Sequence, residues 1–305
     1  MSGAEIFGSS AQMPNGVPYL LVATNTFNEV YEQWDPATCN GGIYWSRDRS
    51  SNADNRRLYK SSISNVQFIL LGARLYKVTG DQTFLKKAND VYQWMFSSGL
   101  VTSQGQVFDG AYAPDCTQVN RNELSYVSGT FLGAIGWMYA VTGNQKYLSD
   151  ANTVLGNTIS LFSKNGVFTD PCEAQGCPAN QVQPKGAAVR GLSYLWNTTT
   201  DQNMKNTIAQ VILTSVQGMS QSCTSAWACG SLWSPGAPIY SDVHTQIVAV
   251  ELLNAAAIIK NVKIQSNVPL GDAPGVTGSR KKNSAVGLAS FLLTSSFAIL
   301  GLFVL

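Results

Sequence analysis

Apolar positions recur along the middle of this chain with the spacing of an amphipathic helix, and the same pattern appears twice. The first set is Phe84, Leu85, Ala88, Val91, Tyr92 and Met95. The second set lies 63 residues later and comprises Tyr147, Leu148, Ala151, Val154, Leu155 and Thr158. Positions with this spacing share one face of a helix, so each set predicts a helix that buries that face. The repeat indicates that the chain is built from a recurring helical hairpin.

The residues ahead of each set predict how the hairpins turn. Tyr76-Lys-Val-Thr-Gly-Asp-Gln matches Tyr139-Ala-Val-Thr-Gly-Asn-Gln. The glycine of each segment is expected in the left-handed conformation that ends many helices. The Asp or Asn that follows it is expected to cap the next helix. A fainter third copy begins at Thr200-Asp-Gln and continues through Met204, Ile208, Val211 and Ile212.

Three further segments have helical periodicity. They cover residues 20–34, 63–73 and 245–259, and the last is apolar almost all round, so it is expected to be buried. The loops between repeats are long and rich in Gly, Cys and aromatic residues. Two of them end alike, in Gly105-Gln-Val-Phe-Asp109 and Gly166-Val-Phe-Thr-Asp170. We therefore favour an all-α ring of hairpins with its polar loops gathered at one end over a plain helical array without a site.

Counting hairpins bears on how much of a ring this chain holds. At roughly 60 residues per hairpin, the segment up to residue 265 contains about four. A closed toroid of six hairpins needs about 360 residues. We also find no charged and apolar secretory signal peptide at Met1-Ser-Gly-Ala-Glu. Both features predict a toroid that is incomplete at its N-terminus.

Charge and motifs exclude several classes of function. Charged residues make up 12% of the 305 residues and the net charge is +2, which gives no basic stripe for nucleic acid. The single histidine, His244, is interpreted as structural. Because metal, phosphate-loop and Ser-His-Asp motifs do not accompany it, we expect no metal, no nucleotide and no other cofactor.

The C-terminal segment resembles a lipid-anchor signal. Residues 286–305 form an apolar run that ends the chain, behind a polar spacer with Arg280, Lys281 and Lys282. Small residues at 271–275 precede the spacer. This order is typical of a glycosylphosphatidylinositol (GPI) signal. We expect a helical domain over 1–265, a linker with the attachment region over 266–285 and a tail over 286–305. A tail-anchored cytosolic protein is the alternative, because a run of this length can cross a bilayer.

The cysteine content favours an oxidising compartment. Six cysteines occur, an even number without metal-ligand spacing. Cys172 with Cys177 and Cys223 with Cys229 are each close enough in sequence to close a small loop, which leaves Cys39 and Cys116 for a long-range pair. Asn197-Thr-Thr is a glycosylation sequon.

Several segments resemble a known family. Trp34-Asp-Pro-Ala-Thr-Cys-Asn-Gly-Gly-Ile-Tyr-Trp45 is similar to the WD-TCGGG-W signature of glycoside hydrolase family 76, the endo-α-1,6-mannanases. Further matching segments are Tyr59–Asn65, Val107–Gly110, Asp115-Cys116 and Lys185–Arg190. The resemblance spans about residues 5–260. It implies an (α/α)6 barrel, a mannan substrate and a retaining mechanism, and the family's fungal branch includes GPI-anchored cell-wall proteins.

The chain departs from the family at its catalytic pair. The resemblance implies two consecutive aspartates just upstream of residue 1, and no Asp-Asp pair occurs in this sequence. Glycoside hydrolysis needs one ionised and one protonated carboxylate. We therefore assign no catalytic residue and expect the chain as written to be inactive. Five other carboxylates occur in or near the loops, and we do not expect them to replace the pair: Asp109, Asp115, Glu123, Asp170 and Glu173.

An uncharged mannan chain calls for aromatic platforms and fixed polar groups. Trp45, Tyr126 and Trp233 are candidate platforms, each with packing in the core or a loop as its alternative. Asn65 and Asp109 are candidates for hydrogen bonds to sugar hydroxyls, and Asp109 has turn capping ahead of Gly110 as its alternative.

Two basic residues lie in a segment similar to the family's FKG-x-x-x-R. Lys185 and Arg190 are therefore candidate substrate-binding residues, although Pro184 replaces the phenylalanine. The guanidinium of Arg190 is predicted to donate two hydrogen bonds to a ligand or, alternatively, to form a structural ion pair.

Three functions stay open at this point. The first is a cell-surface endo-α-1,6-mannosidase or transglycosidase. The second is a non-catalytic mannan-binding surface protein, and the third is a tail-anchored cytosolic scaffold. The first two share a partner, α-1,6-linked mannan or mannose-containing glycans, and a membrane association through a lipid anchor.

Overall fold

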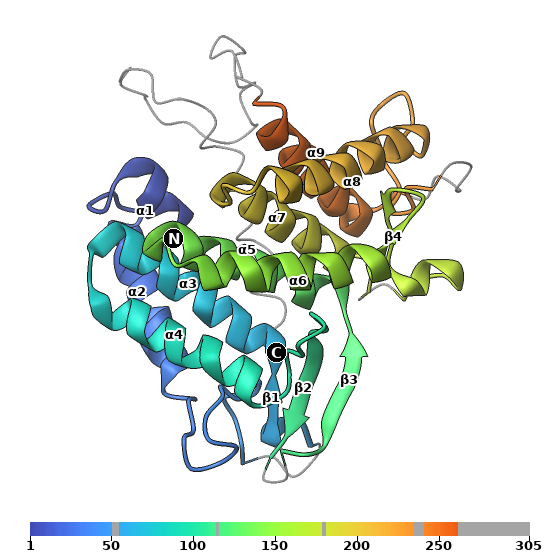
Figure 1. Cartoon of the computed structure of the whole chain (residues 1–305). Helices are drawn as coiled ribbons and strands as arrows, with labels where there is room; N and C mark the ends of the chain where they lie inside the picture. Colours follow the sequence, from blue (N-terminus) through green and yellow to red (C-terminus); the bar gives the residue numbers. More distant parts are fainter. Residues whose placement is uncertain (51–54, 114–115, 179–180, 235–240, 262–305) are drawn as a thin grey trace.

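Three helical hairpins follow one another along the chain, as the repeat predicts (Figure 1). The structure is a computed structural model and describes residues 1–50, 55–113, 116–178, 181–234 and 241–261. The hairpins are α3 (Ser62–Thr79) with α4 (Gln82–Ser97), α5 (Ser125–Thr142) with α6 (Gln145–Phe162), and α7 (Pro184–Thr198) with α8 (Gln202–Gln221). Helices α1 (Ser2–Phe7) and α2 (Tyr19–Tyr31) precede them, and α9 (Val243–Ile259) follows.

The turns inside the first two hairpins have the predicted chemistry. Gly80 and Gly143 end α3 and α5 in the left-handed conformation, with φ of 72° and 67°. The Asp81 carboxylate accepts a hydrogen bond from Thr83 N at 2.8 Å, and Asn144 Oδ1 accepts one from Lys146 N at 3.0 Å. These caps confirm the turns inferred from the sequence.

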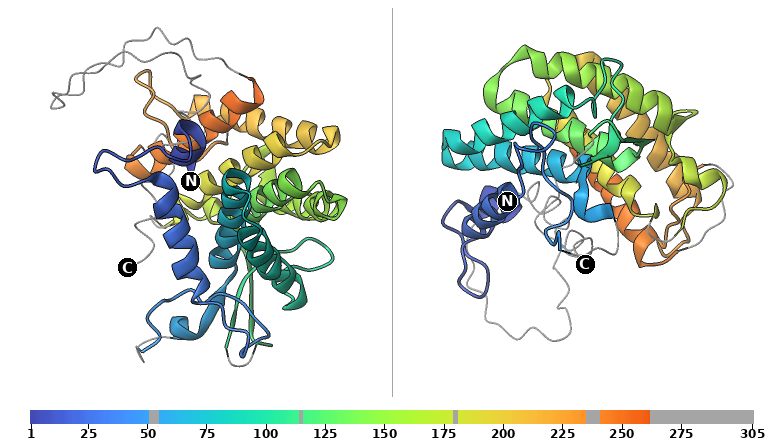
Figure 2. Two further views of the ribbon diagram at one scale, coloured as in Figure 1. Left: turned by 90° about the vertical axis from the view of Figure 1, so that its left-hand side faces the viewer. Right: turned by 90° about the horizontal axis from the view of Figure 1, so that it is seen from below.

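Helices α3, α5, α7 and α9 lie side by side in that order and form an inner row. Helices α4, α6 and α8 cover this row from outside, as Figure 2 shows from two directions. Helix α5 is buried on nearly all sides, because α3, α7 and its own partner α6 surround it. Seen from below, the hairpins follow one another around an arc (Figure 2).

The two ends of the inner row differ. At the short-turn end, where the inner helices stop, two- or three-residue turns lead into α4, α6 and α8. At the long-loop end, where α3, α5, α7 and α9 begin, long segments enter each helix. The gathering of the loops at one end, expected from the sequence, is confirmed. Small sheets in these loops were not predicted. One joins β1 (Tyr59–Ser61), β2 (Phe108–Tyr112) and β3 (Val119–Glu123), antiparallel in that order, and the other pairs β4 (Ser163–Lys164) with β5 (Val167–Phe168).

Glycines bring α5 and α7 into close contact. A Cβ built on Gly191 of α7 would lie 1.9 Å from the backbone oxygen of Gly129 on α5. No other residue type fits at this crossing without moving one of the two helices.

A buried arginine ties the first helix to the inner row. Arg74 of α3 donates to both carboxylate oxygens of Glu5, at 2.9 and 2.5 Å, and to Ser2 Oγ at 3.0 Å. Its guanidinium also lies 5.7 Å from the ring centres of Trp137 on α5 and Tyr194 on α7. One side chain of α3 therefore contacts residues from α1, α5 and α7.

Several other predictions are settled by the described residues. All six cysteines pair, as Cys39–Cys116, Cys172–Cys177 and Cys223–Cys229. Trp34, expected at the end of the helix over residues 20–34, lies beyond α2. Its backbone pairs with Ile43 in an isolated bridge, which takes it out of the helix.

The predicted linker and apolar tail lie outside the described residues, as does Asp115. Within the described part, no helix is both long and apolar enough to span a bilayer.

Candidate functional site

The four loops at the long-loop end share a local structure. Each follows one of α2, α4, α6 and α8, forms a short antiparallel contact and then runs into an inner helix. The contacts are Trp34 with Ile43, Val101 with Val107, β4 with β5, and Cys223 with Cys229. Because these contacts fix the loops locally, the side chains that follow them are held at the entrance to the inner row.

Asp109 lies at this end, in the segment between α4 and α5. It lies on β2, and its Oδ2 accepts hydrogen bonds from the Tyr59 hydroxyl at 2.6 Å and from Asn120 Nδ2 at 2.9 Å. Gly110 makes this arrangement possible, because a Cβ there would lie 2.6 Å from the Tyr59 ring. Three strands therefore meet at one carboxylate, which lies half-buried.

The charge on Asp109 affects its neighbours. Burial raises the pKa of Asp109, and the hydrogen bond from Tyr59 opposes that rise. Burial and the nearby Asp109 charge together raise the pKa of Tyr126, at the start of α5, to about 12. The group thus combines a carboxyl group with a phenol that stays neutral at physiological pH and can donate or accept a hydrogen bond. Two predicted site residues, Asp109 and Tyr126, are brought together here.

Trp45 borders the same group. Its backbone N donates to the carbonyl of Tyr59 at 2.8 Å, and 39% of the residue is exposed. A partly exposed indole on a backbone fixed to Tyr59 is compatible with the predicted role of a platform.

Three predicted site residues are buried instead. Asn65 is fully buried, and its side-chain amide hydrogen-bonds the backbone of Ile43, at 2.9 and 3.1 Å, and the carbonyl of Ser61 at 2.8 Å. Both of its N–H donors are used, so it fixes the loop before α3 and does not face a sugar. Trp233, also 0% exposed, packs in the core and is not a platform.

Lys185 is the third, and it is 1% exposed. Its Nζ lies 2.6 Å from Glu173 Oε1 and 2.6 Å from the carbonyl of Ser231, and 3.8 Å from the ring centre of Trp233. Burial lowers the pKa of this ammonium group, while the Glu173 charge opposes the change. Lys185 therefore joins the loops before α7 and α9, and a direct sugar contact is not supported.

Arg190 has the alternative role that the sequence left open. Its Nη1 lies 3.0 Å from Glu251 Oε1 on α9, so it forms an ion pair between two inner helices. The side chain keeps 21% of its surface exposed. The structure thus shows the ion pair and leaves ligand binding as a prediction.

The sequence missed Tyr59 and Asn120 as partners of Asp109 and Glu173 as the partner of Lys185. Tyr59 lies 50 residues before Asp109, and only the sheet register brings them together. Of the other carboxylates, Glu123 accepts from Asn157 Nδ2 at 2.6 Å. Asp170 caps the short helix over 171–174, and burial raises its pKa.

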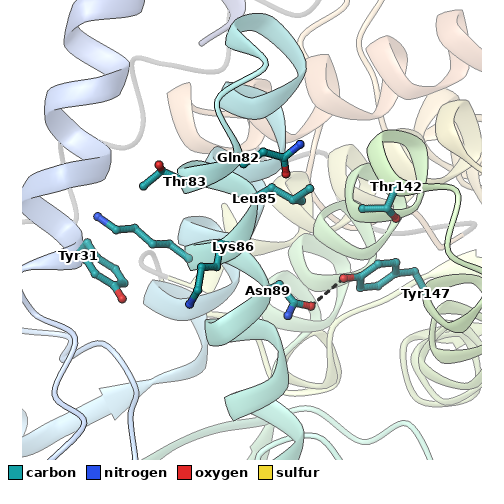
Figure 3. A pocket seen from close by; sticks show the side chains of 9 residues that line it. Tyr31, Gln82, Thr83, Leu85, Lys86, Asn89, Thr142 and Tyr147 are labelled. Atoms are coloured by element: carbon teal, nitrogen blue, oxygen red, sulfur yellow. Dashed lines mark hydrogen bonds between the residues drawn. The ribbon is translucent and has the colours of Figure 1, made fainter.

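A surface hollow of about 610 Å³ lies away from this group. It is formed by α2, α4 and the ends of α5 and α6, around Tyr31, Lys86 and Asn89, whose Oδ1 accepts from the Tyr147 hydroxyl at 2.9 Å (Figure 3). None of the predicted site residues lines it, so the candidate site is the group around Asp109.

The described part of the chain is thus an all-α protein of helical hairpins arranged along an arc, with a half-buried carboxylate and aromatic side chains at its long-loop end. The family model described as glycosyl hydrolase family 76 matches residues 1–269. The chain therefore belongs to this family.

Curated relatives carry mannosidase names. The chain is 30% identical over 226 residues to "Mannan endo-1,6-alpha-mannosidase DFG5" of Saccharomyces cerevisiae. This alignment covers 70% of this chain and 48% of the relative. It is 26% identical over 280 residues to "Mannan endo-1,6-alpha-mannosidase DCW1" of Eremothecium gossypii, with 88% of this chain and 61% of the relative. The chain thus spans about half to three fifths of these relatives.

Solved structures show the same fold. Dfg5 from Chaetomium thermophilum, in complex with glucosamine, aligns with a TM-score of 0.71 and 24% identity, over 83% of this chain and 64% of that one. An inactive variant of an alpha-1,6-mannanase from Salegentibacter sp. HEL1_6, in complex with alpha-1,6-mannotriose, aligns with a TM-score of 0.68 and 24% identity, over 79% and 69%. These family members are (α/α)6 barrels, which confirms the predicted fold class.

Proposed function

We propose that this chain binds α-1,6-linked mannan at its long-loop end, as part of an endo-acting mannosidase or transglycosidase. The observation that carries the proposal is the group of Asp109, Tyr59, Asn120 and Tyr126. It offers one carboxylate acceptor among neutral hydroxyl and amide groups, which suits the hydroxyls of an uncharged sugar. The names of the relatives and the mannotriose complex of the bacterial family member support this substrate class.

We infer that cleavage in this family requires a carboxylate pair that the present sequence does not contain. The inactive bacterial variant carries asparagine in place of two consecutive aspartates. No Asp-Asp occurs in the 305 residues. A retaining mechanism needs two carboxyl groups about 5 Å apart on either side of the glycosidic bond. Without the pair, the chain as written is expected to bind mannan and not to cleave it, which is the non-catalytic function considered from the sequence.

We also propose a location at the fungal cell surface. The three disulfides favour an oxidising compartment over a cytosolic scaffold. The apolar run over 286–305 behind a basic spacer supports a GPI anchor, and Asn197 is exposed near the end of α7, as a glycosylation site requires.

Titration of the full chain with α-1,6-mannotetraose tests the proposal. Asp109→Ala removes the charged acceptor and should weaken binding by about tenfold or more, because hydrogen bonds to charged groups contribute roughly 1.5–3 kcal/mol. Lys86→Ala, in the hollow away from the group, is the control and should leave affinity unchanged. Product analysis of the same mixtures should show intact oligosaccharide. Equal affinity of Asp109→Ala and the unmodified chain would refute the proposed site. No binding by the unmodified chain would refute the proposed substrate.

A further inference from the structure

The loop between α8 and α9 presents a tryptophan in an unusual backbone conformation. The Cys223–Cys229 disulfide closes this turn, and Trp227 N donates to the carbonyl of Thr224 at 2.9 Å. Thr224 N in turn donates to the carbonyl of Ala228 at 2.9 Å. Trp227 has φ of 59°, which is the left-handed region. Hairpins of this kind normally place glycine at that position, because a bulky side chain there costs free energy.

The chain contains its own reference for this turn. In the loop before α5, Gly105 N donates to the carbonyl of Thr102 at 3.0 Å, and Thr102 N donates to the carbonyl of Gln106 at 3.0 Å. The threonine hydroxyl accepts a backbone N–H at 3.2 Å in both turns. Gly105 has φ of 83° at the position that Trp227 occupies in the other turn. The two turns are thus built alike, with glycine in one and tryptophan in the other.

Burial does not explain the tryptophan. Trp227 is 63% exposed, so its indole gains little from packing. The backbone of the turn is nevertheless held by Gln246 of α9, through Trp227 and Cys229. Gln246 Nε2 donates to the Trp227 carbonyl at 3.1 Å, and Gln246 Oε1 accepts from Cys229 N at 3.0 Å. The turn is therefore fixed to the inner row while the indole remains open to solvent.

We propose that Trp227 is a platform on which a distant hexose unit of the bound glycan chain stacks. This inference rests on the proposed function. An indole face suits the flat C–H face of a pyranose, and its N–H can donate to a hydroxyl. The loop before α9 belongs to the same end of the row as Asp109. It lies two inner helices further along, which is roughly 16–20 Å at ordinary helix spacings. A short oligosaccharide held at Asp109 does not reach it, whereas a longer one does.

The Trp227→Gly variant of the full chain tests the platform, because it restores the residue of the matching turn. The melting temperature should stay the same or rise, since glycine adopts this conformation without strain. The Kd for α-1,6-mannohexaose should increase about tenfold, the loss of one stacked ring, and the Kd for α-1,6-mannobiose should not change. Trp227→Phe should keep most of the affinity for the hexasaccharide.

Each outcome has a distinct meaning. Equal affinity of Trp227→Gly and the unmodified chain for the hexasaccharide overturns the platform and leaves the proposed function intact. Equal losses for both oligosaccharides also overturn it, because the effect is then not that of a distant unit. A loss of binding to phospholipid vesicles without a change for mannan assigns the indole to a membrane instead. If the unmodified chain binds neither oligosaccharide, the proposed function fails first.

Discussion

The close crossing of α5 and α7 predicts a large penalty for a single added methyl group. In Gly191→Ala, the new Cβ would lie 1.9 Å from the oxygen and 2.4 Å from the carbonyl carbon of Gly129. Both are backbone atoms of a buried helix, so no side-chain rotation relieves the overlap. Overpacking typically costs about 1–3 kcal/mol, and rigid backbone on both sides argues for the upper end or beyond. The higher helix propensity of alanine offsets about 1 kcal/mol of this cost, so the free energy of unfolding should fall by about 2–3 kcal/mol.

The chain offers a matched control on a neighbouring helix. Gly156 of α6 has open space around the position of its Cβ, with no atom within 4 Å. Gly156→Ala should therefore stabilise the fold by about 0.5–1 kcal/mol. Gly133 is intermediate, because its Cβ would lie 3.2 Å from Gly191. Stability should therefore increase from Gly191→Ala through Gly133→Ala to Gly156→Ala.

Urea unfolding of the full chain, followed by far-ultraviolet circular dichroism, measures these differences. The midpoint should fall for Gly191→Ala and rise for Gly156→Ala with similar slopes. If the two alanine variants have equal stability, the close contact between α5 and α7 is not present and the reasoning from it is wrong.

Three further changes address the site. Tyr59→Phe removes a donor that favours the ionised form of Asp109, so the Asp109 pKa should rise further above the usual 3.8. Mannan affinity that needs the carboxylate is present above this pKa and lost as pH falls through it. The midpoint of affinity against pH should therefore move up by about one unit, and an unchanged midpoint would contradict the assignment. Lys185→Met leaves the buried Glu173 charge unpaired and should cost about 3–5 kcal/mol in urea unfolding. Adding Glu173→Gln should recover part of that loss, and no recovery would show that the pair is uncoupled. Trp45→Ala should weaken mannotetraose binding several-fold at constant stability in calorimetric titration, and unchanged affinity would remove Trp45 from the site.

The helical hairpins were predictable because their signals are local. Gly80 and the capping Asp81 lie next to each other in the sequence, and the apolar stripe that follows them needs no distant partner to be recognised. The ring was inferred from the long loops between the repeats, which are rich in Gly, Cys and aromatic residues. The small sheets were not predicted, because strands as short as Val167–Phe168 have too few residues to show alternation.

The site was harder to predict because burial of polar side chains depends on distant partners. Asn65 and Lys185 are polar residues in family-like segments, which favoured ligand binding. Their partners Ile43 and Ser231 lie 22 and 46 residues away and satisfy them inside the protein. The unusual position of Trp227 could have been recognised from the sequence. Thr102-Ser-Gln-Gly-Gln aligns with Thr224-Ser-Ala-Trp-Ala, which places Trp227 opposite a glycine.

The two ends of the inner row have different roles: the short turns set the geometry of the hairpins, and the long loops carry the candidate site. Glycine or Asp/Asn caps set the geometry of α3–α4 and α5–α6 at the short-turn end, without help from any residue near Asp109. Insertions or exchanges in the segments entering α5, α7 or α9 therefore leave the hairpin geometry intact. Members of such a family can acquire new sugar preferences by altering loop tips alone, while the helical frame is inherited unchanged.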